Sequence, residues 1–237
     1  MLAQVTQIVI PYLAGLYLTL IVVFFFFGCW ILLLFLRKMR KTGSHMPYIL
    51  VTSLFFLFLG VSRVIFAWFD FIVTNFDSTT YPSYAWDWKI ATAVTLVGMA
   101  SFAYQLEKKP LQNKTKGIMT IIVCAFTVLM IVYPVTDTFS FNIDQSFVIG
   151  PVACVVVTPF IYFYLAVRVP AFKFTGVIIG IGIILLIVGE LIVANFVVAF
   201  FQASGMDRGS IYILAQVLKI AGAVLVGSAF IRELKRE

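Results

Sequence analysis

The chain has 237 residues, of which 62% are hydrophobic and only 11% are charged, and its formal net charge is +7. A composition this apolar lies outside the range of soluble globular domains. The basic residues stand at the ends of apolar runs and form no basic face with interleaved aromatic residues. This pattern argues against nucleic-acid binding and predicts an integral membrane protein surrounded by the lipid bilayer.

Successive apolar runs reach or approach the ~20 residues that a helix needs to cross a bilayer. In chain order they predict spanning helices at about 9–36, 47–74, 87–106, 117–135, 147–167, 174–201 and 210–231. The connections between these runs are short and contain no linker, repeat or low-complexity segment. The sequence therefore predicts an all-α integral membrane protein in which residues 1–237 form a single seven-transmembrane helix bundle.

The lysines and arginines predict the orientation of this bundle. They cluster after the first, third, fifth and seventh predicted helices, at Arg37, Lys38, Arg40 and Lys41; at Lys108, Lys109, Lys114 and Lys116; at Arg168 and Lys173; and at Arg232, Lys235 and Arg236. The positive-inside rule then places the amino terminus outside and the carboxyl terminus in the cytoplasm, as expected for a multi-pass protein of the plasma membrane. The basic inner loops could dock an acidic cytoplasmic signalling partner or anionic lipid.

Aromatic residues gather near the predicted outer end of the third helix, at Tyr81, Tyr84, Trp86 and Trp88. We interpret them as an interfacial belt that anchors the protein in the membrane. The three cysteines lie inside apolar runs, and there is a single histidine. Neither residue type has the spacing of metal ligands, and no paired-acid or Ser/His constellation is present. We therefore predict no metal site and no enzymatic activity.

Four charged residues fall inside the predicted spans beyond their first and last turns: Arg63, Asp70, Glu190 and Lys219. Charged side chains at this depth usually face the bundle interior and have partners, because burying them in hydrocarbon is costly. Counted from the predicted outer ends, Arg63, Glu190 and Lys219 each lie about ten residues, or about 15 Å, below the outer surface. Three different helices thus bring charges to one level of the bundle.

These residues predict a charge network inside the bundle. Glu190 and Lys219 are expected to form an ion pair, with Arg63 close enough to share Glu190. Asp70 lies about two turns above Arg63, Asp87 adds an acceptor at the outer mouth, and Gln216 shares the small, polar face of the last helix with Lys219. We take the following as candidate ligand- or ion-binding residues: Arg63, Asp70, Asp87, Glu190, Gln216 and Lys219. A purely structural network that fixes which helices are neighbours stays open as an alternative.

Three kinds of function are compatible with such a network. We favour a receptor or sensor that binds a small ligand or ion within the bundle and signals on its cytoplasmic side. A small-solute or ion transporter or channel is an alternative, since intramembrane charges often line transport pathways. The odd number of helices, and the absence of a recognisable broken helix pair in the sequence, weigh against transport.

Two short fragments resemble the microbial rhodopsins. "KIAG" at Lys219 in the last predicted helix is similar to the residues after the Schiff-base lysine of that family, and Asp87-Trp88 is similar to its counterion–tryptophan pair. The resemblance implies a photoreceptor or pump with retinal on Lys219. The chain departs from the family pattern at Ala215 and Tyr84, and its sixth predicted helix lacks the residues that clamp the retinal ring. Retinal is therefore not favoured, and the cofactor stays unknown.

Overall fold

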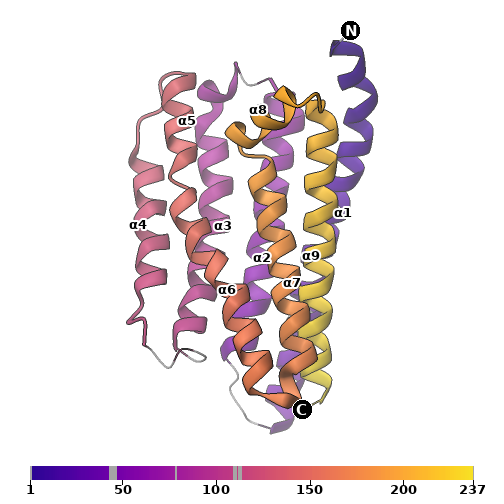
Figure 1. Cartoon of the computed structure of the whole chain (residues 1–237), viewed down its shortest axis with the longest axis vertical. Helices are drawn as coiled ribbons and strands as arrows, with labels where there is room; N and C mark the ends of the chain where they lie inside the picture. The colour runs from indigo at the N-terminus through magenta and orange to yellow at the C-terminus, as the bar shows by residue number, and fades with distance from the viewer. Residues whose placement is uncertain (1, 43–46, 78, 109–110, 112–113, 237) are drawn as a thin grey trace.

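The structure is a computed structural model that describes the chain except residues 1, 43–46, 78, 109–110, 112–113 and 237 (Figure 1). The described part is helical and contains no strand. Its α-helices are α1 (Leu2–Thr42), α2 (Pro47–Ala67), α3 (Ala85–Lys108), α4 (Ile118–Val132), α5 (Thr138–Ser146), α6 (Ile149–Arg168), α7 (Lys173–Ile192), α8 (Asn195–Ala203) and α9 (Arg208–Arg236). The π-helix η1 (Trp68–Val73) continues α2, and η2 (Tyr81–Tyr84) and η3 (Pro170–Phe172) are 3₁₀ turns.

Within the described ranges, five segments are long and apolar enough to cross a membrane: Val9–Lys41, Pro47–Val73, Thr138–Arg168, Pro170–Ile192 and Arg208–Lys235. The protein is therefore an all-α, multi-pass membrane protein. The helix α3 carries charged residues in its first and last turns. The helix α4 has only 15 residues, about 22 Å of helix, which is shorter than the ~30 Å hydrocarbon core.

The long helices stand side by side (Figure 1), and the contacts between them close into a ring. Each contacts the next in the order α1, α2, α3, α4, α6, α7 and α9, and α9 contacts α1. The helices α1, α3, α6 and α9 all end at the end of the bundle where the carboxyl terminus lies (Figure 1). Their basic last turns are therefore gathered at one end, which we call the basic end.

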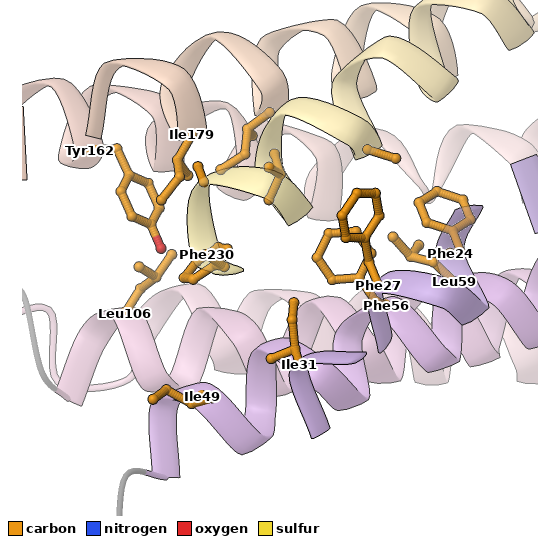
Figure 2. Close-up of a cluster of buried hydrophobic side chains, with 14 of the residues drawn as sticks. Phe24, Phe27, Ile31, Ile49, Phe56, Leu59, Leu106, Tyr162, Ile179 and Phe230 are labelled. Carbon is orange, nitrogen blue, oxygen red and sulfur yellow. The ribbon is translucent and has the colours of Figure 1, made fainter. Parts of the chain in front are cut away.

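The half of the bundle toward the basic end is packed with apolar side chains (Figure 2). Phe56 of α2 packs against Phe24 and Phe27 of α1, with ring centroids 6.1 and 5.8 Å apart. Ile179 of α7 and Phe230 of α9 belong to the same cluster. In a bilayer, where lipid is as apolar as these side chains, close packing rather than burial holds helices together. This apolar core joins α1, α2, α7 and α9, whose other halves line the opposite part of the bundle.

The helices α7 and α9 approach closely where two glycines face each other. A Cβ atom added to Gly222 would lie 2.6 Å from the carbonyl oxygen of Gly182, and one added to Gly182 would lie 2.9 Å from that of Gly222. Only glycine allows two backbones this near to one another. Further along the same contact, a Cβ on Gly189 would lie 2.7 Å from Lys219 Cγ. The stem of Lys219 is therefore pressed against α7.

The structure differs from two predicted spans because helix breaks interrupt the apolar runs. The range predicted at 174–201 is divided, since α7 ends at Ile192 and α8 begins at Asn195 after an extended Ala194. The range predicted at 147–167 is the second part of a longer segment in which α5 and α6 meet at residues 147–148. Residues 192–195 at the α7–α8 break are apolar except for Asn195 and include no proline or glycine, so hydropathy does not reveal the break.

Two aspartates cap helices at the end of the bundle opposite the basic end. Asp137 Oδ1 accepts a hydrogen bond from the Ser140 amide (2.7 Å), and Asp207 Oδ1 accepts one from the Ser210 amide (2.9 Å). The Ser140 amide and hydroxyl hold the pKa of Asp137 below its ordinary value, and the Ser210 hydroxyl and amide do the same for Asp207. Because folding lowers these pKa values, the caps stabilise the fold above the ordinary pKa of aspartate and lose this effect as the pH falls through the folded-state values.

Candidate ligand cavity

A cavity of ≈ 540 Å³ lies in the half of the bundle opposite the basic end. Its wall is mostly apolar and aromatic with a few polar groups, which is typical of small-molecule sites. The helices α1, α2, α3, α5, α6, α7 and α9 all contribute to this wall, together with η1 and η2. The lining residues that matter below are Tyr17, Arg63, Phe69, Asp70, Tyr81, Trp88, Thr92, Leu96, Glu190, Tyr212 and Lys219.

Three charged side chains of this wall form one ion-paired cluster, which we call the charge triad: Arg63, Glu190 and Lys219. Glu190 Oε2 lies 3.0 Å from Lys219 Nζ, and Glu190 Oε1 accepts a hydrogen bond from Arg63 Nη2. The side chains of Arg63 and Lys219 are 5% and 1% exposed, whereas that of Glu190 is 29% exposed and borders the cavity. The ion pairs expected from the sequence are thus present. Two cations and one carboxylate leave the triad with one net positive charge.

Glu190 occupies the last turn of α7, two residues before Ile192, and not the middle of a helix as the predicted span implied. A carboxylate at the C-terminal end of a helix is unfavourable, because the helix dipole places partial negative charge there. Arg63 from α2 and Lys219 from α9 offset that charge. The triad consequently ties the end of α7 to two other helices at the level of the cavity.

Asp70 is a second charged group in the wall, and it lies on the π-helix η1 with 8% exposure. Its Oδ2 accepts a hydrogen bond from the Tyr17 hydroxyl of α1 (2.7 Å). Among the described residues, no lysine or arginine lies within ion-pair distance of Asp70. Asp70 is thus a buried carboxylate with a hydroxyl partner and no cationic one.

Several segments in which the helices are interrupted or irregular line the cavity. The π-helix η1 replaces α-helical geometry at the end of α2, α5 meets α6 at residues 147–148, and α7 stops before α8. Irregular backbone at membrane depth is tolerated where it is enclosed by protein or lines a cavity, and π-helical turns frequently occur at functional sites. These irregular segments supply the following residues to the cavity wall: Phe69, Asp70, Ser146, Val148, Val193 and Ala194.

The structure thus brings four of the six candidate residues into one wall and leaves two outside it. Asp87 is half-buried in the first turn of α3 and does not line the cavity. Gln216 is fully buried outside the wall, and neither atom of its side-chain amide has a hydrogen-bond partner in the described part of the chain.

Two aromatic residues of the cavity were interpreted from the sequence as part of the interfacial belt. Tyr81 and Trp88 are only 5% and 9% exposed, and both line the cavity. Tyr84 and Trp86 are 43% and 64% exposed, as expected of a belt. Helical spacing does not separate the two sets, because Tyr84 stands four positions before Trp88 and would share its face on an α-helix, while Tyr81 lies in the 3₁₀ turn before α3.

A buried lysine outside the cavity was also missed. Lys89 of α3 is 4% exposed, and its Nζ donates a hydrogen bond to the carbonyl oxygen of Tyr133 (2.5 Å), the residue after α4. The same Nζ lies 3.4 Å from Asp144 Oδ2 of α5. A cation therefore meets the carbonyl end of α4, where the helix dipole favours positive charge.

The other end of α4 is held by a carboxylate of the same helix α3. Glu107, 1% exposed, accepts hydrogen bonds from the Met119 amide (2.8 Å) and from the amide and hydroxyl of Thr120 (3.3 and 2.6 Å). At each end of the short helix α4, a charged side chain of α3 thus satisfies some of the backbone groups that the helix itself leaves free. These side chains give α4 polar partners inside the protein at both of its ends.

We expect Glu107→Gln and Lys89→Met each to lower the free energy of unfolding by about 1–3 kcal/mol, because each leaves buried backbone groups of α4 without a strong partner. The measurement is thermal or denaturant unfolding of the purified protein in lipid nanodiscs. Lys108→Met, at an exposed position of the same helix, serves as the control. Losses no larger than that of the control would show that α4 does not depend on these caps.

No protein-family model, no curated protein and no solved structure matches this chain.

Proposed function

We propose that the protein is a seven-helix receptor or sensor of the plasma membrane that binds a small ligand inside the bundle. The observation that carries this proposal is the convergence of irregular helix segments and the charge triad on one cavity. Charged side chains that face a cavity within the membrane usually mark a functional site. Helix breaks beside such a cavity supply segments that can move when a ligand binds.

The helices α3 and α4 would supply the sixth and seventh crossings. Support comes from their places in the ring and from the α3 side chains that satisfy both ends of α4. The gathering of the basic helix ends at one end of the bundle supports an external amino terminus and a cytoplasmic carboxyl terminus. The cavity would then open toward the outside, and the basic end would meet a signalling partner or anionic lipid.

The packed apolar core favours a receptor over a transporter, because a solute that entered the cavity would meet close-packed rings such as Phe24, Phe27 and Phe56 on its way inward. One observation keeps transport as the second candidate. A smaller cavity of ≈ 50 Å³, lined by apolar residues of the core half, shares Glu190 with the main cavity. Solute uptake into proteoliposomes that is lost with Arg63→Ala would favour transport.

The retinal alternative concerns the same cavity, since both Lys219 and Trp88 line it. The carboxylate paired with Lys219 is Glu190, whereas Asp87 lies outside the wall. Incubating the purified protein with all-trans retinal decides the matter. Visible absorbance that is lost in Lys219→Ala would support a Schiff base, and a colourless preparation would remove this alternative.

Filling the cavity tests the proposal directly. Leu96 lines the cavity and is 1% exposed, while the next residue, Val97, is 46% exposed on the outer surface of α3. Within a panel of small amphipathic compounds, we expect some to raise the unfolding temperature of the wild type and of Val97→Trp but not of Leu96→Trp. A compound at 100 times its Kd stabilises by about 2.7 kcal/mol, which is readily measured. An equal response from the folded Leu96→Trp protein would place binding elsewhere.

A further inference from the structure

The charges in the cavity wall are arranged as two separate poles. The charge triad has one net positive charge, because Arg63 and Lys219 share the single carboxylate of Glu190. Asp70 supplies the negative pole, since its partner Tyr17 is uncharged and no described cation lies within ion-pair distance of it; Lys219, Arg63 and Arg208 act on it only over longer distances. Residues 63 and 70 are seven positions apart, which corresponds to about 10 Å along a helix.

The surroundings of the negative pole are aromatic. Phe69, the residue before Asp70, packs its ring against Tyr81 with centroids 5.1 Å apart. Trp88 and Tyr212 also line the cavity. A cavity wall that combines a carboxylate with aromatic rings suits an alkylammonium group, because both the charge and the ring quadrupoles attract a cation. Arg208, the basic residue at the start of α9, rests on the Tyr212 ring with its Cζ 5.6 Å from the centroid and makes no ion pair with Asp70.

The positive pole has hydrogen-bonding capacity that the described protein groups leave unused. The Nε of Arg63 is a buried donor without a partner. The hydroxyl of Thr92, in the cavity wall, is also without one. Buried polar groups in folded proteins are nearly always satisfied. A donor left free beside a net positive cluster favours an incoming acceptor that carries negative charge.

We infer that the cavity takes a zwitterionic small molecule, with its alkylammonium end in the aromatic pocket at Asp70 and its anionic end at the charge triad. A ligand with a single charge would satisfy one pole and leave the other uncompensated in a low-dielectric site. An uncharged ligand would satisfy neither. This inference rests on the proposed function, because it names the class of ligand for the same cavity.

Three ligands of equal shape test it on the unmodified protein. γ-Butyrobetaine carries a trimethylammonium group and a carboxylate. Its carbon isostere, with a tert-butyl group in place of trimethylammonium, keeps only the negative charge, and its amide keeps only the positive charge. We expect the betaine to bind at least about tenfold more tightly than either analogue, because each analogue loses the contribution of one pole. Isothermal titration calorimetry in nanodiscs measures the three Kd values.

Two variants assign the poles. In Asp70→Asn, the advantage of the betaine over the carbon isostere should disappear while its advantage over the amide remains. Lys219→Met leaves Arg63 and Glu190 as a neutral pair. In this variant, the advantage of the betaine over the amide should disappear while its advantage over the carbon isostere remains. A change that merely disturbed the fold would weaken all three ligands alike, so these selectivity ratios separate binding from structure.

Each outcome bears on the inference. Equal affinity of the wild type for the betaine and the carbon isostere would remove the negative pole, and equal affinity for the betaine and the amide would remove the positive pole. Either result overturns the zwitterion. If none of the three binds while other compounds of the amphipathic panel still depend on Leu96, the ligand class is wrong and the cavity keeps its proposed function. If the panel also fails, the proposed function itself falls.

Discussion

Glu190→Gln is expected to lower the free energy of unfolding by about 3–5 kcal/mol, because it leaves Arg63 and Lys219 buried without their shared carboxylate. Both cations are almost fully enclosed, and Lys219 is additionally pressed against Gly189 of α7. Each side chain would have to leave its present position to recover its solvation. The loss is measured by denaturant or thermal unfolding of the purified protein in nanodiscs.

A double-mutant cycle separates this ion pair from general disturbance of α7. In a Lys219→Met background, Glu190→Gln removes only the partner of Arg63, so its cost should be smaller than in the wild type. For residues in direct contact, the difference is on the order of 0.5–3 kcal/mol. Identical losses of unfolding free energy in the two backgrounds would show that Glu190 and Lys219 are not coupled. The charge triad would then not contribute to stability as a unit.

Gly222→Ala should destabilise the protein by about 1–3 kcal/mol, although alanine is the better helix former. The added methyl group would lie 2.6 Å from the Gly182 carbonyl oxygen and 2.9 Å from the Leu186 amide nitrogen, both of which are backbone atoms of α7. Backbone cannot rotate away as a side chain can, so α7 and α9 would have to separate. The unfolding temperature in nanodiscs reports the effect.

The chain contains a matched control for this substitution. Gly15 lies in α1 with nothing within 4 Å of its added Cβ. Gly15→Ala should therefore be neutral or stabilising by up to about 1 kcal/mol, since it only removes the conformational freedom of glycine from a helix. Opposite signs for the two substitutions identify the α7–α9 contact as the cause. If Gly222→Ala behaved like Gly15→Ala, the close approach of the two backbones would be refuted.

The contact between Arg63, Glu190 and Lys219 was predictable from the sequence. Of the two grounds for this prediction, the need of a buried charge for a partner was sounder than the estimated depth of each residue. A charge in an apolar run has to find a partner, and these three residues supply opposite signs on different helices. The estimated depth of Glu190 below the outer surface was wrong, because it was counted from an expected helix end near residue 201, whereas α7 ends at Ile192. The prediction was therefore correct because a buried charge needs a partner, and not because the estimated depths agreed.

Asp70 shows where sequence reasoning stopped. Its depth above Arg63 was evident, but its partner Tyr17 is 53 positions away on α1 and stands in an apolar run with nothing to mark it. Tyr81 and Trp88 looked like belt residues because aromatic residues near a predicted membrane boundary usually are. Whether such a ring faces lipid or the interior depends on the rotation of its helix in the bundle.

By itself, the sequence determined that this is a multi-pass helical membrane protein and that its interior charges belong together, because hydrocarbon imposes both requirements on each segment separately. Only the tertiary structure decided that α7 breaks after Ile192, that α3 caps α4, and that Asp70 bonds to Tyr17 with no described cation within ion-pair distance. These features depend on how helices rotate and pack against one another. Contacts between distant segments set that packing, and no local pattern of residues records it.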